Sequence, residues 1–174
     1  MMGEAAIPGA PTFGEWQRGK SASRGRGLKR VLKGLRTLFA SKSDYLENKF
    51  LDHALSDGAF AEPANVYMAL CTAVPTDAST GATLTEATYT GYARQEILAT
   101  DLSAAASGSK TNSAAITFAA CTAGTSTIIG FAIVDSATTG AGNVLYWGTT
   151  TSKVIDTTST PGTVAIGGLV VTED

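Results

Sequence analysis

The charged residues of this 174-residue chain divide it into two oppositely charged parts, and the division limits what the chain can fold into. Residues 1–42 contain nine Lys or Arg and two acidic residues, a balance of +7. Residues 43–174 contain four Lys or Arg and thirteen acidic residues, a balance of −9. The first part is too basic and too rich in Gly to build its own core, so we predict a basic arm followed by one domain.

A short predicted helix over residues 44–55 begins the domain. Asp44 and Glu47 have the spacing of a capping box, and Gly58 supplies a stop signal after the helix. One face of the helix is predicted to carry the apolar residues Leu46, Phe50, Leu51 and Leu55. This helix therefore marks the boundary between arm and domain.

The first fifteen residues or so of the arm are predicted to be extended. Pro8 and Pro11 neither propagate a helix nor pair inside a central strand. Phe13 and Trp16 are the large apolar side chains of this stretch, and a Trp in a solvated tail is a common anchor for docking into a partner's pocket. The alternative is that both aromatic side chains are simply exposed.

The rest of the arm contains a predicted basic amphipathic helix over residues 28–39. Its apolar stripe would be Leu28, Val31, Leu32, Leu35, Leu38 and Phe39. The other side carries Lys29, Arg30, Lys33 and Arg36. Gly34 weakens such a helix by about 1 kcal/mol relative to Ala, so we expect it to fold against a surface.

Three surfaces are possible for this helix: a partner protein, its own domain, and a membrane or nucleic acid. We favour the partner protein over packing on its own domain, and the lack of aromatic residues interleaved for base stacking argues against nucleic acid. We expect no nucleic acid and no membrane among the partners. The residues expected to anchor the arm to a partner are Phe13, Trp16, Arg18, Lys20, Arg24, Arg26, Leu28, Lys29, Arg30, Val31, Leu32, Lys33, Leu35, Arg36, Leu38 and Phe39.

The sequence GEWQRGKS at 14–21 matches the phosphate-loop pattern of Gly, four residues, and Gly-Lys-Ser. Such a loop binds nucleotide only when a buried strand delivers it and a helix follows at once, so that backbone amides converge on the phosphates. Here prolines precede the pattern and a Gly- and Arg-rich stretch follows it. We therefore expect no nucleotide, and no other cofactor.

The domain is predicted to be all-β, an antiparallel β-sandwich or jelly roll preceded by the arm and one or two short helices. Short apolar or alternating segments recur between turns rich in small residues. The candidate strands are 65–72, 92–98, 114–119, 127–134, 144–148, 153–155, 163–166 and 169–171. Two long Thr-rich loops, 76–90 and 135–143, separate some of them.

The sequence predicts no membrane-spanning helix, no secretory signal and no disulfide. The apolar runs fall well short of the roughly 18–20 residues that span a bilayer, and residues 1–15 do not resemble a secretory signal. Cys71 and Cys121 lie in apolar strand-like settings, where two buried free thiols are expected and a disulfide has no support from spacing.

No catalytic or metal-binding constellation is predicted. His53 lies on the predicted helix beside Asp52, but the sequence has no Gly-x-Ser-x-Gly motif that would supply a nucleophilic serine. One His and two distant Cys do not have the spacing of a zinc site. Paired carboxylates leave glycan cleavage as a remote alternative. Arg94 is the cation of the predicted strand 92–98, so we expect it to form a buried or interfacial ion pair.

Six segments of the domain together resemble a family of small virion proteins of tailed bacteriophages, variously described as tail fibre, head fibre or head-decoration proteins. They are YLENKFLDH (45–53), VYMALCTAVPTD (66–77), GYARQ (91–95), NSAAITF (112–118), GFAIVD (130–135) and LYWG (145–148). The resemblance covers about residues 43–174. It implies a structural protein without a catalytic motif, and it does not include the basic arm.

The resemblance and the arm together suggest a non-enzymatic virion protein that is assembled in the host cytoplasm. The arm would lie along major capsid, portal or neck proteins, and the domain would be a head decoration, minor capsid protein or collar fibre. The alternative is a receptor- or glycan-binding tail fibre module that uses the two Thr-rich loops. The symmetry of a phage particle favours a homo-oligomer.

Overall fold

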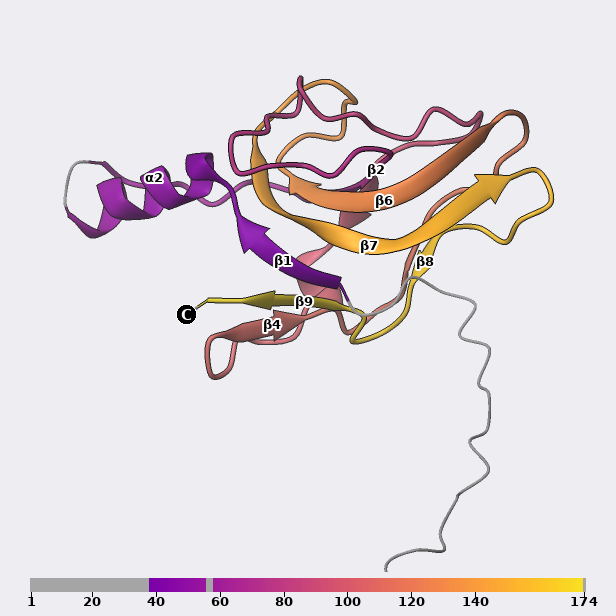
Figure 1. The fold of residues 1–174 in the computed structure, drawn as a ribbon. Helices are drawn as coiled ribbons and strands as arrows, with labels where there is room; N and C mark the ends of the chain where they lie inside the picture. Colours follow the sequence, from indigo (N-terminus) through magenta and orange to yellow (C-terminus); the bar gives the residue numbers. More distant parts are fainter. Residues whose placement is uncertain (1–37, 56–57, 174) are drawn as a thin grey trace, which may run out of the picture. The chain divides into compact units, whose positions relative to one another are not determined.

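A computed structural model describes residues 38–55 and 58–173 (Figure 1). The extended arm with Phe13 and Trp16, the 14–21 pattern and the helix predicted for residues 28–37 lie outside these residues. The described elements are β1 (Leu38–Lys42), α2 (Asp44–Ala54), β2 (Val66–Cys71), β3 (Gln95–Ile97), the 3₁₀ turn η2 (Ala99–Asp101), β4 (Ser109–Thr111), β5 (Ile116–Thr117), β6 (Thr125–Val134), β7 (Val144–Asp156), β8 (Thr163–Val164) and β9 (Leu169–Thr172).

Seven of these strands form one curled sheet in the order β3-β2-β6-β7-β1-β9-β4, and β5 pairs with β8 (Figure 1). The predicted all-β fold is confirmed. The neighbouring strands are antiparallel except β1 and β9, which run parallel with Leu38 opposite Leu169, so the sheet is mixed. The long hairpin of β6 and β7 forms its centre, with bulges beside Gly130 and between Ile133 and Val134.

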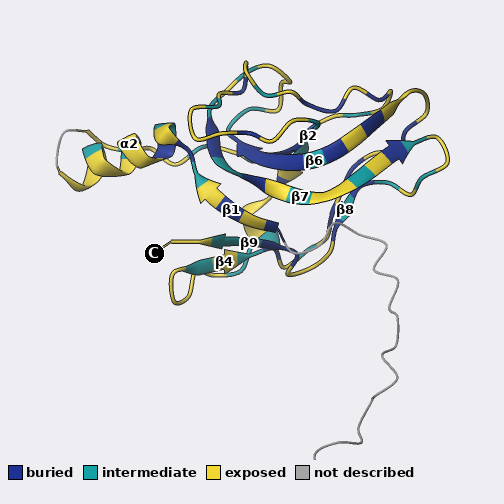
Figure 2. Cartoon of the chain, in the orientation of Figure 1, coloured by how far each residue is buried: buried dark blue, intermediate teal, exposed yellow. Residues whose placement is uncertain are grey.

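The core lies on both faces of the sheet, because side chains alternate along each strand. On β2, Met68 and Leu70 belong to the larger cluster, and Ala69 and Cys71 belong to the smaller one. Figure 2 shows the buried residues concentrated on β2, β6 and the ends of β7. The larger cluster also includes Phe118, Phe131, Ile133, Leu145 and Leu169.

The predicted strands agree with the structure over most of the domain. The segment 65–72 is β2, 127–134 lies within β6, and 169–171 lies within β9. The candidates 92–98, 114–119 and 163–166 shorten to β3, β5 and β8, and Arg94 lies just before β3. The segment between the candidate strands 92–98 and 114–119 contains the additional strand β4, and the candidates 144–148 and 153–155 are parts of the single strand β7.

The helix predicted over residues 28–39 is wrong for its last two residues, because Leu38 and Phe39 lie in strand β1. Leu38 is 1% exposed, Phe39 is 67% exposed and Ala40 is 8% exposed, which is the alternation of a strand. Hydrogen bonding to β7 and β9 on both sides fixes this segment. Leu38 therefore belongs to the core of the domain, and Phe39 remains exposed on the sheet.

The predicted helix after β1 is confirmed as α2, but its cap lies one residue earlier. Ser43 is the N-cap: its hydroxyl accepts a hydrogen bond from the Leu46 N–H at 3.3 Å and donates to the carbonyl of Val144. Asp44 and Glu47 occupy the first turn, where carboxylates favour the helix dipole. The described helix is not long and apolar enough to span a membrane.

Candidate functional site

The two Thr-rich loops, 76–90 and 135–143, lie against each other, and we refer to them together as the loop platform. A β-bridge joins Thr80 to Asn143, and the Gly81 N–H donates to the Gly142 carbonyl at 2.9 Å. The approach is so close that a Cβ atom on Gly81 would lie 2.0 Å from the Ala141 carbonyl oxygen. Gly81 therefore allows the two loops to meet along their backbones.

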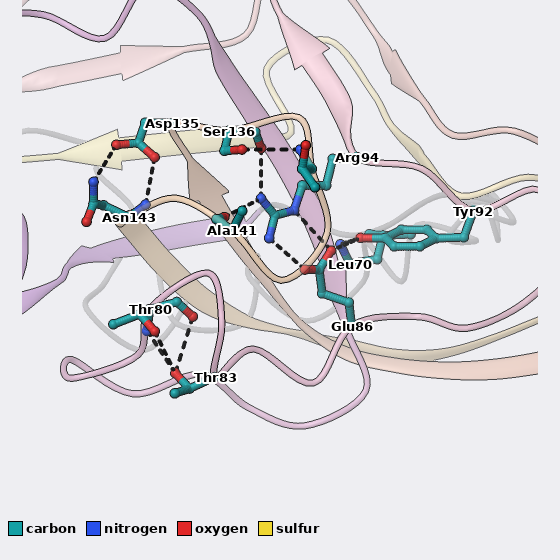
Figure 3. A network of polar contacts seen from close by, with 11 residues as sticks. Leu70, Thr80, Thr83, Glu86, Tyr92, Arg94, Asp135, Ser136, Ala141 and Asn143 are labelled. Carbon is teal, nitrogen blue, oxygen red and sulfur yellow. Dashed lines mark hydrogen bonds and ion pairs between the residues drawn. The ribbon is translucent and has the colours of Figure 1, made fainter.

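A buried ion pair between Glu86 and Arg94, the residue just before β3, joins the two loops of the platform (Figure 3). Arg94 Nη2 lies 2.7 Å from Glu86 Oε1, and Arg94 Nε donates to Glu86 Oε2 at 3.2 Å. The side chains are 0% and 4% exposed. Arg94 Nη1 also donates to the carbonyl oxygens of Ser136 and Ala141, at 2.7 and 2.9 Å. The guanidinium group thus joins one loop through a carboxylate and the other through its backbone.

Tyr92 extends this network into the sheet. Its hydroxyl donates to Glu86 Oε2 at 2.7 Å and accepts from the Leu70 N–H at 3.1 Å. Burial, followed by the hydrogen bond to Glu86, raises the pKa of Tyr92 far above the usual range for a phenol. The phenol therefore remains a hydrogen-bond donor to Glu86 at neutral pH.

Further hydrogen bonds shape each loop locally (Figure 3). Asp135 accepts from the Asn143 N–H at 2.6 Å and from Asn143 Nδ2 at 2.7 Å. In the other loop, Thr83 Oγ1 accepts from the Thr80 N–H at 2.8 Å. The platform is thus preorganised, and its exposed threonines include Thr76, Thr80, Thr83, Thr85, Thr88, Thr90, Thr138 and Thr139.

A separate apolar pocket of about 360 Å³ lies on the face of the sheet that carries the larger core cluster. Its walls include Val66, Ile97, Ile133, Leu145 and Leu169. At its edge, the Tyr146 hydroxyl donates to Glu173 Oε1 at 2.7 Å, and Lys42 pairs with Glu173 Oε2 at 2.6 Å. Burial, then the hydrogen bond to Glu173, raises the pKa of Tyr146.

The described residues contain no arrangement that suggests catalysis. Within 38–55 and 58–173, no three His, Cys, Asp or Glu side chains gather closely enough to hold a metal ion. His53 Nδ1 accepts a hydrogen bond from the Phe60 N–H at 3.3 Å, which is a structural role. Cys71 and Cys121 are buried and free, as predicted. Burial raises the pKa of the Cys71 thiol to about 12, so it is not a nucleophile at neutral pH.

The structure confirms the ion pair predicted for Arg94, with Glu86 as its partner. The sequence did not identify Glu86, Tyr92 or the two loop carbonyl groups as members of this network. The position of Arg94 in a predicted strand indicated only that Arg94 needs a partner. Of the anchoring residues proposed in the arm, the structure describes Leu38 and Phe39, and both lie in β1. The other anchoring residues, from Phe13 to Arg36, lie outside the described part of the chain.

Comparison with known protein families identifies a match that covers most of the described residues. Residues 41–172 match a family model described as podophage GP4 fiber I protein gp80. The match begins inside β1 and ends at the last residue of β9, so it includes the loop platform and the apolar pocket. No curated protein matches the chain significantly.

Proposed function

The chain belongs to the podophage GP4 fiber I protein family, gp80, and from this we propose that it is a head-decoration, minor capsid or collar fibre attached by its N-terminal arm. A fibre protein of a podophage is a structural component of the virion. Beyond membership of the family, the proposal states where on the particle the protein lies and that its arm attaches it there. No catalytic role is proposed.

The observation that carries the proposal is the position of the family match. Residues 41–172 match the family, and residues 1–40 precede the match. Those forty residues contain eight Lys or Arg and two acidic residues, a balance of +6, whereas the domain is acidic. A basic extension on an acidic fibre domain supports a separate task for the arm, namely attachment.

The chemistry of the arm fits a protein surface of the particle. Its cations favour an acidic surface, and its aromatic residues Phe13 and Trp16 fit pockets in neighbouring subunits. We propose major capsid, portal or neck proteins as these neighbours, with assembly in the host cytoplasm. Leu38 is not part of this contact surface, because it is buried in the domain.

Phage particles that carry arm variants test the proposal. We expect a chain lacking residues 1–36 to fold but to be missing from purified particles, and Trp16→Ala with Phe13→Ala to lower its copy number. Arg18→Glu with Lys20→Glu should also lower incorporation. Lys110→Glu with Lys153→Glu changes the same number of charges within the domain and is the matched control.

The measurement is the number of copies per particle by quantitative mass spectrometry. Normal incorporation of the chain lacking residues 1–36 would refute attachment through the arm. An equal loss with the Lys110→Glu and Lys153→Glu control would show that charge matters without regard to position. Incorporation through the domain itself would then replace the proposal.

A second candidate is a receptor- or glycan-binding module, which the loop platform favours. Its loops are held by Arg94 and Glu86, and they expose many threonine hydroxyl groups. A preorganised surface loses little conformational entropy when it binds a ligand. Binding of the purified chain to host cells, abolished by Thr83→Lys and Thr139→Lys but retained with Lys110→Glu, would support this function. Absence of binding to cells that the phage infects would count against it.

A further inference from the structure

Helix α2 exposes apolar side chains that the described domain does not cover. Leu46, in its first turn, is 3% exposed, but Leu51 is 58% exposed and Leu55, the C-cap, is 76% exposed. Figure 1 shows α2 extending beyond the end of β1, and Figure 2 shows most of its surface as exposed. Leu51 and Leu55 are therefore available to a second surface that would cover them.

The covered and uncovered sides of α2 can be separated. Phe50 packs edge to face against Phe60 with ring centroids 5.8 Å apart, and Lys42 Nζ lies 5.8 Å from the Phe50 ring. Glu47, Leu51 and Leu55 are spaced by four residues and therefore form a row along the helix. All three are exposed, and we refer to this row as the α2 stripe.

The charge of α2 narrows the choice of partner. The helix contains three carboxylates, Asp44, Glu47 and Asp52, and one lysine, Lys49, so its balance is −2 with His53 neutral. Within the described residues, none of these carboxylates forms a salt bridge. A partner for α2 should therefore be both apolar and basic.

Residues 28–36 of the chain have this chemistry. Their sequence, LKRVLKGLR, contains four Lys or Arg and no acidic residue, a balance of +4. Their apolar residues, Leu28, Val31, Leu32 and Leu35, recur at helical spacing. We propose that residues 28–36 of a neighbouring copy form a helix on the α2 stripe, so that copies of the fibre protein are joined by exchanged arms.

The length of the chain explains why the segment would come from a neighbouring copy. A helix of nine residues is about 13.5 Å long, and residue 37 alone connects it to Leu38. Leu38 lies at the end of β1 that is far from α2, and β1 spans about 13 Å. A helix folded back along β1 would therefore end near Lys42, and Leu51 lies about 10 Å further along α2. The α2 stripe of the same chain is out of its reach.

The exchange leaves residues 1–27, with Phe13 and Trp16, available for attachment to the particle. The inference assigns residues 28–36 to a neighbouring copy and restricts the proposed attachment to residues 1–27, so the two proposals can be tested separately. The proposed exchange is also consistent with Gly34 in the middle of the arm segment, because a helix weakened by Gly forms only on a surface that stabilises it.

Disulfide trapping between two full-length variants tests the exchange. One variant carries Leu32→Cys, at the centre of the arm segment, and the other carries Leu51→Cys, at the centre of the α2 stripe. The native Cys71 and Cys121 are buried and should not interfere. With one variant isotope-labelled, mild oxidation of the mixture should give mainly the dimer that links Leu32→Cys to Leu51→Cys. Replacing Leu51→Cys by Thr139→Cys, an exposed loop position, is the matched control.

The outcomes separate the possible occupants of the stripe. Mainly Leu51→Cys homodimers would show that α2 packs on α2 and would overturn the proposal, as would the absence of any linked dimer. Equal linking to Thr139→Cys would show random collision and would also overturn it. In addition, Leu51→Asp with Leu55→Asp should weaken self-association of the full chain by about tenfold or more in analytical ultracentrifugation. Unchanged self-association would contradict the exchange.

Discussion

Arg94 and Glu86 show what a charged pair does in a domain with few buried charges. The guanidinium group makes four hydrogen bonds at 2.7–3.2 Å to Glu86 and to two loop carbonyls. Glu86 therefore neutralises the charge of Arg94. The guanidinium group in turn supplies hydrogen-bond donors to the carbonyl groups of Ser136 and Ala141, which would otherwise need other donors. The described residues contain no buried side-chain polar atom without a hydrogen bond.

Replacing one member of this pair should be costly. We expect Glu86→Gln to lower the free energy of unfolding by about 3–5 kcal/mol, because the buried Arg94 charge loses its counterion. Glu173→Gln is the matched control, since the Lys42–Glu173 pair is partly exposed, at 29% and 39%. That change should lower the free energy of unfolding by about 1 kcal/mol or less. Urea unfolding measures both, and similar values for the two variants would contradict the structural role of the buried pair.

At the scale of elements, the junction of the two loops is a backbone contact. Gly81 lies against Ala141 and Gly142, and its N–H donates to the Gly142 carbonyl. A side chain at this position cannot be accommodated by rotating a neighbouring side chain, because the nearest atoms belong to the backbone. The loop platform therefore depends on glycine at this point.

We expect Gly81→Ala to separate the loops and to lower the free energy of unfolding by about 1–3 kcal/mol. Amide hydrogen exchange should become faster at Gly81 and around Asn143, which bridges to Thr80. Gly58→Ala is the control, since a Cβ atom there meets nothing within 4 Å. Unchanged exchange in the Gly81→Ala variant would show that the loops meet more loosely than described.

At the scale of the whole molecule, β1 connects two parts of the sheet. It pairs with β7 on one side and with β9 on the other, and β4 joins the sheet through β9. Leu38 and Ala40 contribute to the core from this strand. The described domain therefore includes β1, which lies within the stretch that charge alone assigns to the arm.

Two truncations should behave differently. Removing residues 1–36 should leave cooperative unfolding at an unchanged denaturant midpoint, because β1 is retained. Removing residues 1–42 should lower the midpoint strongly or prevent folding, because β9 and β4 lose their connection to β7 and the core loses Leu38. Near-ultraviolet circular dichroism and urea unfolding measure the difference. Equal stability of the two truncated chains would show that β1 is dispensable.

The sequence alone determined features that depend on local pattern. Turns rich in small residues and alternating apolar segments predicted the all-β class, and Leu46 with its neighbours predicted α2. The position of Arg94 within a predicted strand predicted that it is paired. These features can be predicted locally. The periodicity of apolar side chains is visible within a few neighbouring residues, and a charged residue among them needs a partner if the segment is buried.

The tertiary structure decided the features that depend on distant partners. Leu38 and Phe39 continue a helical stripe in sequence, but they become a strand because β9, more than 120 residues later, pairs with them. The carbonyl groups of Ser136 and Ala141, more than 40 residues after Arg94, become its hydrogen-bond acceptors only because the fold brings their loop to it. Strand pairing and loop contacts of this kind join residues far apart in the chain, so the local sequence does not contain the information that selects them.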